Sequence, residues 1–222
     1  MNLATLLKNK INKKTAKIAI IGMGYVGHPL AITISKKFKV VGFDISLKRI
    51  NSLKKKIKVN KNLLLTTDNN NLKNIDIFIL CLPTPLKPNK DPDLSYIKKG
   101  FKTIKNFIKK GQAISLESTS YPGTTREIIS NNLKKMKYQI GKNFFVCFSS
   151  EREDPGNKKF KLFDITKVFS GHSEQCSKIF KKFYGSVFKK IHNAKTLEIA
   201  EMSKLLENIY RAVNIGLVNE MK

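Results

Sequence analysis

A glycine fingerprint near the N-terminus constrains the fold of this chain more than any other feature. Gly22-x-Gly24-x-x-Gly27 stands between a strand-like apolar run, Lys17–Ile21, and a segment of helical character. In that context the first glycine permits a tight turn, the second lets a pyrophosphate approach the backbone, and the third allows close packing of helix on strand. The start of the helix offers free N–H groups to phosphates. The pattern predicts a dinucleotide site, and the alternative is a plain glycine-rich turn.

An acidic residue stands where a dinucleotide fold needs one. The second apolar run, Val40–Phe43, ends at Asp44. A carboxylate at this place hydrogen-bonds the ribose diol and repels a 2′-phosphate, so the residue favours NAD over NADP. The alternative interpretation is that Asp44 only caps the following helix.

Strand-like apolar runs alternate with helical segments along the chain. Continuous apolar strands are typical of a parallel sheet covered on both faces, so this order predicts an α/β fold with a Rossmann-like, doubly wound, mostly parallel sheet. We expect strands at 17–21, 40–43, 63–65, 75–82, 113–116, 144–148, 168–170 and 187–191. We expect helices up to about residue 38 and then at 46–56, 94–110, 124–137, 174–184 and from 197 onward.

Two polar segments follow neighbouring strands at the sheet edge where open α/β folds bind ligands. Pro83-Thr84-Pro85 stops one strand and brings the Thr84 hydroxyl to that edge, although a simple strand terminator is the alternative. Glu117-Ser118-Thr119 follows the next strand.

The net charge of +27 has two interpretations. Lysine supplies 39 of the 43 basic residues, spread over the whole length, and arginine supplies four. A nucleic-acid surface is normally clustered and often uses arginine. The charge therefore indicates a lysine-rich composition, with nucleic-acid binding as the weaker alternative. Arg49, Arg152 and Arg211 lie beside other candidate site residues, whereas Arg126 is expected to pair with solvent or a nearby acid.

Composition excludes several classes of protein. Apolar residues make up 41% of the chain, enough to bury a core. No run of about 18 apolar residues predicts a membrane span, and the N-terminus has no apolar signal region. Three cysteines without CxxC spacing argue against a disulfide scaffold or a metal cluster and fit a reducing cytoplasm.

A polar stripe runs along the predicted final helix. Glu201, Lys204, Asn208 and Arg211 share one face of a helix that is otherwise largely apolar. Such a helix either presents one polar face to a site or is amphipathic with a solvated face, and the spacing leaves both open. A lysine in a dry site can stabilise a developing oxyanion.

Several motifs in one order resemble the nucleotide-sugar 6-dehydrogenase family, of the UDP-glucose and UDP-mannosamine type. They are Gly22-Met-Gly-Tyr-Val-Gly27, Pro83-Thr-Pro85, Glu117-Ser-Thr119, Ser150-Glu-Arg-Glu-Asp-Pro-Gly-Asn157 and Ala200-Glu-Met-Ser-Lys-Leu-Leu-Glu-Asn208. The run from Lys204 to Lys222 is most similar to the branch that acts on UDP-N-acetylglucosamine. The resemblance covers nearly all of this chain but only about the first half of a typical member.

The resemblance implies an activity and a set of roles. The family oxidises the C6 hydroxymethyl of a UDP-sugar to a carboxylate with NAD, for surface polysaccharide biosynthesis. The expected cofactor-binding residues are Gly22, Gly24, Tyr25, Val26, Gly27, Asp44, Arg49, Thr84 and Thr119. The expected catalytic residues are Lys204, Glu151, Asn208 and Thr119, where Glu151 orients a water and Lys204 stabilises negative charge. The expected substrate-binding residues are Arg152, Glu153, Lys204, Asn208 and Arg211.

The resemblance also implies a division of the chain. Residues 1–196 are expected to form the NAD-binding domain and residues 197–222 the beginning of a central dimerisation helix, with a homodimer for the full-length enzyme. The family's nucleophilic cysteine and its UDP-binding domain follow that helix and are expected to be missing here. None of Cys81, Cys147 and Cys176 has the glycine-rich context of that nucleophile. A non-catalytic NAD-binding module is therefore an alternative to the enzyme.

Overall fold

The computed structural model describes residues 2–56, 60–150 and 165–222. These residues form one eight-stranded sheet with the order β3-β2-β1-β4-β5-β6-β7-β8. Every neighbouring pair is parallel except β6 and β7, so the last two strands run opposite to the other six. The strands are β1 (Lys17–Ile21), β2 (Lys39–Phe43), β3 (Leu63–Thr66), β4 (Ile77–Leu80), β5 (Ala113–Leu116), β6 (Phe145–Ser149), β7 (Lys167–Gly171) and β8 (Ile191–Asn193).

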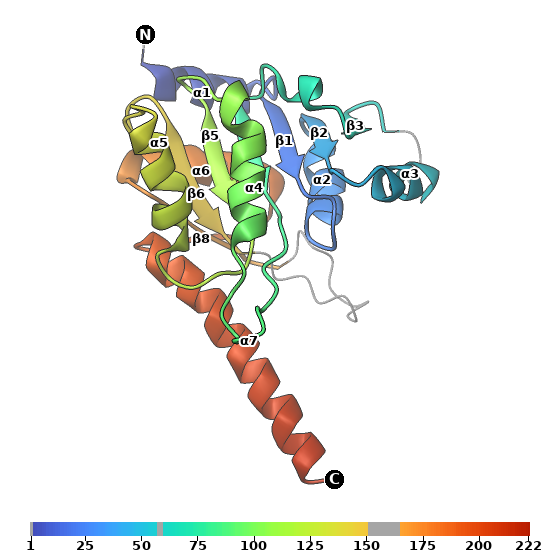
Figure 1. Ribbon diagram of the computed structural model, residues 1–222. Helices are drawn as coiled ribbons and strands as arrows, with labels where there is room; N and C mark the ends of the chain where they lie inside the picture. The colour runs from blue at the N-terminus through green and yellow to red at the C-terminus, as the bar shows by residue number, and fades with distance from the viewer. Residues whose placement is uncertain (1, 57–59, 151–164) are drawn as a thin grey trace.

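Helices cover both faces of this sheet (Figure 1). One apolar cluster joins the sheet to α1 (Leu3–Asn12), α2 (Gly27–Ser35), α3 (Leu47–Lys56) and α6 (Glu174–Val187). A second cluster on the opposite face joins it to α4 (Ser95–Ile104), α5 (Asn131–Lys135) and the start of α7 (Leu197–Glu220). Three short segments complete the described elements: η1 (Asn69–Leu72), η2 (Lys105–Phe107) and η3 (Thr125–Ser130). The doubly wound, mostly parallel fold is confirmed.

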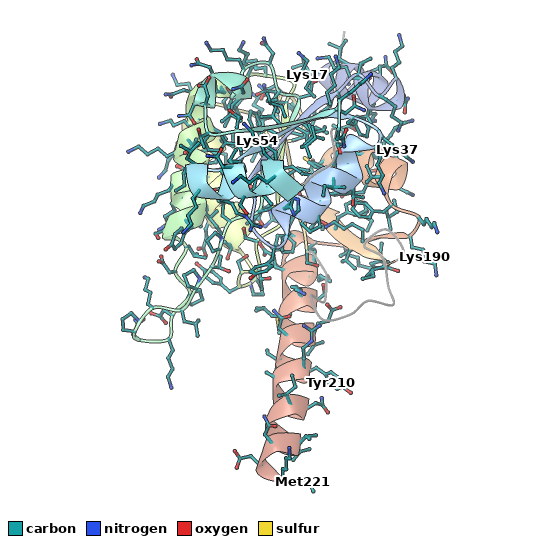
Figure 2. All side chains as sticks on the ribbon, turned by 90° about the vertical axis from the view of Figure 1, so that its right-hand side faces the viewer. Lys17, Lys37, Lys54, Lys190, Tyr210 and Met221 are labelled. Carbon is teal, nitrogen blue, oxygen red and sulfur yellow. The ribbon has the colours of Figure 1, made fainter. Side chains whose placement is uncertain are left out.

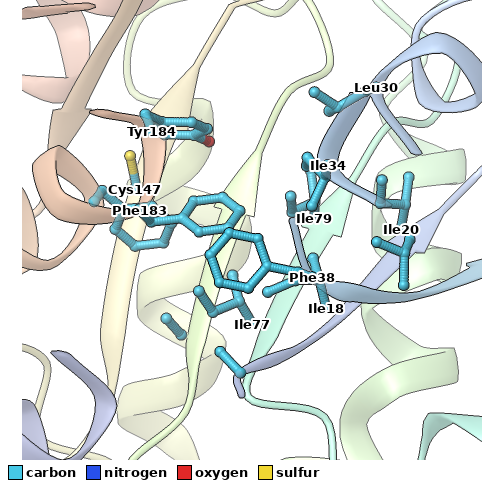
Figure 3. Packing of buried hydrophobic residues seen from close by; sticks show 14 of the residues in the cluster. Ile18, Ile20, Leu30, Ile34, Phe38, Ile77, Ile79, Cys147, Phe183 and Tyr184 are labelled. Atoms are coloured by element: carbon cyan, nitrogen blue, oxygen red, sulfur yellow. The ribbon is translucent and has the colours of Figure 1, made fainter. Parts of the chain in front are cut away.

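The strands are buried because both of their faces carry apolar side chains. In β1, all residues after Lys17 are buried, and Ile18 and Ile20 face α2 while Ala19 and Ile21 face the α4 side. Figure 3 shows part of the first cluster, where strand side chains such as Ile18 and Ile77 meet α2 and α6. There the ring centres of Phe38 and Phe183 lie 5.7 Å apart, so the segment after α2 packs against α6 on the same face of the sheet.

Several predicted elements differ from the structure in their bounds. The strand expected at 75–82 is shorter, at Ile77–Leu80, and the helix expected at 94–110 ends as α4 at Ile104, with only the short segment η2 after it. The helix expected at 124–137 begins as the π-helical segment η3, in which the Asn131 N–H donates to the Arg126 carbonyl five residues earlier, and continues as α5. The strand expected at 187–191 begins later, at Ile191. The Phe188 N–H still donates to the Tyr184 carbonyl. The apolar residues Val187 and Phe188, expected to begin the strand, therefore form the C-terminal end of α6.

The last helix leaves the body of the domain. Only the first turns of α7 contact the sheet, and the remainder projects away with Tyr210 and Met221 on it, whereas lysines surround the body (Figure 2). The buried residues of α7 are Leu197, Ala200, Glu201 and Lys204. Among the described residues, no helix combines the length and apolar character that crossing a membrane requires.

Candidate functional site

A cleft of about 710 Å³ lies at the carboxyl edge of the parallel strands. This is the edge where open α/β sheets bind ligands, next to the point where the strand order reverses between β1 and β4. Its walls come from the ends of β1, β2, β4 and β5, from α4 and from α7. The lining residues are Ile21, Gly22, Gly24, Tyr25, Val26, Phe43, Asp44, Ile45, Cys81, Leu82, Pro83, Thr84, Tyr96, Lys99, Gly100, Thr103, Glu117, Ser118, Thr119, Lys204 and Asn208.

The three glycines of the fingerprint have different surroundings. Gly22 has a φ of +94°, and a Cβ there would lie 2.3 Å from the Cys81 carbonyl oxygen. A Cβ on Gly27 would lie 1.9 Å from the Gly22 carbonyl oxygen, so this glycine lets α2 start directly against the turn. Around Gly24 there is open space, with nothing within 4 Å of a Cβ position. The turn and the packing thus need two of the glycines, and the third leaves room for a ligand.

Asp44 and Arg49 hold the glycine loop. The Asp44 carboxylate accepts hydrogen bonds from the Met23 N–H, at 2.8 Å, and from the Ser46 N–H, at 2.9 Å. The Arg49 Nε donates to the Met23 carbonyl at 2.7 Å. A carboxylate oxygen can accept two hydrogen bonds, and each Asp44 oxygen accepts one of the two bonds from Met23 and Ser46. The carboxylate can therefore also accept a hydrogen bond from a ribose hydroxyl. Asp44 lines the cleft, whereas Arg49 and Gly27 are not among the lining residues and act on the loop itself.

The ends of β4 and β5 are tied together at the floor of the cleft. The Ser118 Oγ accepts a hydrogen bond from the Leu82 N–H at 2.9 Å. The Thr84 hydroxyl donates to the Thr119 carbonyl at 2.7 Å. Pro83-Thr84-Pro85 therefore does more than end a strand: it forms one polar edge with Ser118 and Thr119.

The polar stripe of α7 divides among three surroundings. Glu201 is fully buried and accepts hydrogen bonds from the Gly123 N–H (2.6 Å), the Thr125 N–H (2.9 Å) and the Thr125 hydroxyl (2.7 Å). Lys204, 8% exposed, and Asn208 line the cleft. Arg211 is exposed on the projecting part of α7 and does not line the cleft. Glu201 thus anchors the helix that presents Lys204 and Asn208.

Three of the predicted residues, Glu151, Arg152 and Glu153, lie outside the described residues. Arg126, expected to pair with solvent or a nearby acid, forms an ion pair with Glu198 at the start of α7.

One charged network near the cleft was not predicted from the sequence. Glu117 receives hydrogen bonds from the Lys167 Nζ and from the Tyr184 hydroxyl, both at 2.5 Å, and the side chains of Glu117 and Lys167 are almost completely buried. The Tyr184 hydroxyl also lies 2.8 Å from the Ser115 Oγ. Burial, and next the Glu117 charge, raise the pKa of Tyr184 well above its usual range, so this phenol remains a donor. The network fixes the end of β5 to β7 and α6.

All three cysteines of the chain are buried. Burial raises the pKa of Cys147 and of Cys176 above the usual value for a thiol. Because the thiolate is the reactive form, these two side chains are poor nucleophiles. Their surroundings agree with the prediction that neither replaces a catalytic cysteine.

Known proteins resemble the chain over most of its length. Residues 16–188 match the family model described as the UDP-glucose/GDP-mannose dehydrogenase family, NAD binding domain. The chain is 36% identical to a UDP-N-acetyl-D-glucosamine 6-dehydrogenase of Salmonella typhi and 39% identical to Protein CapL of Staphylococcus aureus. Both matches cover 92% of this chain and 51% of the relative, so the chain spans about half the length of these curated relatives. The solved structure of a UDP-D-ManNAc dehydrogenase from Pyrococcus horikoshii aligns with a TM-score of 0.84 at 32% identity, covering 92% of this chain and 52% of that one.

Proposed function

The chain belongs to the UDP-glucose/GDP-mannose dehydrogenase family, and on that premise we propose that it serves the NAD-dependent oxidation of the C6 hydroxymethyl of a UDP-sugar to the uronate. The sugar we propose is UDP-N-acetylglucosamine, in surface polysaccharide biosynthesis. The observation that carries the proposal is the cleft itself. It brings the glycine loop and Asp44 together with Thr84, Thr119, Lys204 and Asn208.

The residues of the cleft fit a bound NAD. Open space around Gly24 admits a pyrophosphate beside the start of α2, and Asp44 offers acceptors to the adenosine ribose. We assign Gly22, Gly24, Tyr25, Val26, Gly27, Asp44, Arg49, Thr84 and Thr119 to cofactor binding, with Gly27 and Arg49 acting by support of the loop. When bound there, NAD⁺ supplies the hydride acceptor for the oxidation.

The other end of the cleft supports the chemical step. The nearly buried Lys204 carries an ammonium that can stabilise negative charge on the reacting oxygen, and the Asn208 amide, one turn later, can hydrogen-bond it. We propose Thr119 and Glu151 as the further catalytic residues, with Glu151 orienting a water. Arg152, Glu153 and Arg211 are proposed to join Lys204 and Asn208 in holding the substrate.

The proposed organisation follows from these assignments. Residues 1–196 form the NAD-binding domain, and residues 197–222 begin a central helix that mediates a homodimer. Apolar side chains along the projecting part of α7 support that role, since Leu206, Val213 and Val218 are each more than half exposed. We place the protein in the cytoplasm and attribute its charge to lysine-rich composition rather than to nucleic-acid binding.

Calorimetry of the 222-residue chain tests the cofactor assignment directly. NAD⁺ is expected to bind the wild type and not the Gly24→Val variant, because a valine side chain fills the space that a pyrophosphate needs. Absence of NAD⁺ binding to the folded wild type would contradict the proposal. The substrate assignment is tested by joining the chain to the second half of a curated relative, where UDP-N-acetylglucosamine should yield NADH and the Lys204→Met variant should not.

A further inference from the structure

A stripe of α4 forms part of the cleft wall. Tyr96, Lys99, Gly100 and Thr103 recur at the spacing of one helix face and all line the cleft. None of them belongs to the glycine loop or to the strand ends that the proposed function uses. The stripe is therefore a wall without an assigned ligand contact.

This wall faces the part of the cleft next to β2. Ile21 and Phe43, at the ends of β1 and β2, line the cleft and belong to the apolar cluster that contains Ile97 and Phe101 of α4. They therefore lie on the α4 side of the sheet. In a dinucleotide fold the acidic residue that ends the second strand marks the adenosine ribose, and here that residue is Asp44. The α4 stripe consequently borders the adenosine end of the cleft.

A glycine on α4 lets this helix approach the glycine loop closely. A Cβ on Gly100 would lie 2.1 Å from the Leu82 Cδ1, so Leu82 occupies the space that a larger residue on α4 would need. On its other side, the Leu82 Cδ2 lies 3.1 Å from a Cβ position on Gly22. Leu82 is thus the spacer between α4 and the loop, and it fixes the distance between the two walls.

Two apolar side chains line this end yet remain accessible to solvent. Ile45, directly after Asp44, is 85% exposed, and Tyr96 is 41% exposed. The Lys99 Nζ lies 6.0 Å from the centre of the Tyr96 ring. Apolar and aromatic surfaces of this kind gain by covering a planar ring, since stacking on a base needs only a π-face and no specific hydrogen bond.

We propose that Tyr96 is the stacking residue for the adenine ring of the dinucleotide, with Ile45 on the facing wall and Lys99 beside it favouring the negative charge of the adenosine phosphate. The proposal rests on NAD binding at this cleft. It assigns to α4 a role in cofactor affinity that the glycine fingerprint does not supply.

Ligands that carry only one end of the cofactor test this assignment. We would measure dissociation constants for ADP-ribose and for nicotinamide mononucleotide by calorimetry on the wild type, Tyr96→Ser and Tyr96→Phe. Loss of stacking should weaken ADP-ribose by about fivefold or more in Tyr96→Ser, because stacking on an aromatic side chain is worth at least that much per base. Tyr96→Phe keeps the ring and should bind ADP-ribose as the wild type does. Affinity for nicotinamide mononucleotide should be the same in all three.

Matched variants control for general effects. Tyr210→Ser removes a tyrosine that is 72% exposed on α7, outside the cleft, and should leave ADP-ribose affinity unchanged. For the charge, Lys99→Gln should weaken ADP-ribose by about twofold to threefold at low salt and not at high salt, as expected for an exposed cation. Lys98→Gln, on the neighbouring residue that lines a different groove, should have no effect.

Separate outcomes would overturn the inference and the proposed function. If the wild type binds ADP-ribose and NAD⁺ but Tyr96→Ser binds ADP-ribose equally well, Tyr96 does not stack on adenine. An equal loss of nicotinamide mononucleotide affinity in Tyr96→Ser would also overturn it, by showing a general distortion of the cleft. If the folded wild type binds neither NAD⁺ nor ADP-ribose, the proposed function itself fails.

Discussion

Replacing Glu201 by alanine removes the contact that anchors α7 to η3. Its carboxylate accepts three hydrogen bonds, from the Gly123 N–H and from the N–H and hydroxyl of Thr125. The Thr125 bonds are buried, whereas the Gly123 bond is only partly buried and can be replaced by water. Two buried donors left without an acceptor, at about 1–3 kcal/mol each, give an expected loss of about 3 kcal/mol in the free energy of unfolding.

The neighbouring Glu198 provides the matched control. It is the same residue type one turn earlier on α7, but its side chain is 36% exposed and its partner Arg126 is 43% exposed. An exposed ion pair contributes about 1 kcal/mol or less, so Glu198→Ala should cost no more than that. Urea denaturation of the wild type and both alanine variants compares the two. Equal losses for Glu198→Ala and Glu201→Ala would refute the role of Glu201 as the anchor.

A glutamine at position 201 separates the hydrogen bonds from the charge. Burial raises the pKa of the Glu201 carboxyl, and the bonds from Thr125 and Gly123 offset this only in part. Because the pKa of Glu201 is higher in the folded state, the protonated carboxyl favours folding. This contribution to the free energy of unfolding is fully present below the unfolded pKa, about 4.3, and is lost as the pH rises through the native pKa. Glu201→Gln should therefore cost about 1 kcal/mol or less at neutral pH, and the wild type should gain stability relative to it as the pH is lowered toward 4.3. A loss as large as that of Glu201→Ala would contradict this reasoning.

Three further predictions concern the cleft and its support. Gly24→Ala should keep wild-type stability but weaken NAD⁺ binding by about tenfold or more, because its Cβ enters the open ligand space. Gly27→Ala should lower the free energy of unfolding by about 2 kcal/mol or more, because its Cβ overlaps a carbonyl oxygen. Thermal melts and calorimetry distinguish the two effects. Asp44→Asn should weaken NAD⁺ about tenfold and improve NADP⁺ relative to it, measured as a ratio of dissociation constants. Lys167→Met should cost about 3–5 kcal/mol by leaving the buried Glu117 charge without this ammonium, and adding Glu117→Leu should recover part of the loss in urea denaturation; a double variant as unstable as the sum of the singles would exclude coupling.

The fold and the cofactor loop could be predicted because their signals are local in sequence. Each parallel strand is buried on both faces, so it reads as a continuous apolar run, as Lys17–Ile21 does. The glycine loop and Asp44 follow strand ends directly, and the geometry of a parallel sheet brings strand ends to one edge. Thr84 and Thr119 meet at that edge for the same reason.

The remaining parts of the site depend on contacts between distant segments. Lys167 and Tyr184 lie 50 and 67 residues from Glu117, and one lysine among 39 carries no signal of its own. The α4 stripe reads as the solvated face of an amphipathic helix. The close approach of Gly100 to Leu82 sets that face against the cleft wall, and its sequence signal is a glycine inside a helix.

The split of the α7 stripe explains why its spacing left two interpretations open. Glu201 is buried against η3, Lys204 and Asn208 line the cleft, and Arg211 stands on the part of the helix that projects from the domain. A helix that is anchored at its first turns and free beyond them can do all three, so both interpretations hold for different turns. Within the described residues, the cofactor end of the cleft is bordered by the glycine loop, the strand ends and α4. Arg211 is exposed and lies outside the cleft formed by these residues. If Arg211 grips the nucleotide-sugar as proposed, the second wall of the substrate end must come from other surfaces, and Arg211→Ala should leave NAD⁺ affinity unchanged because the two ends are built separately.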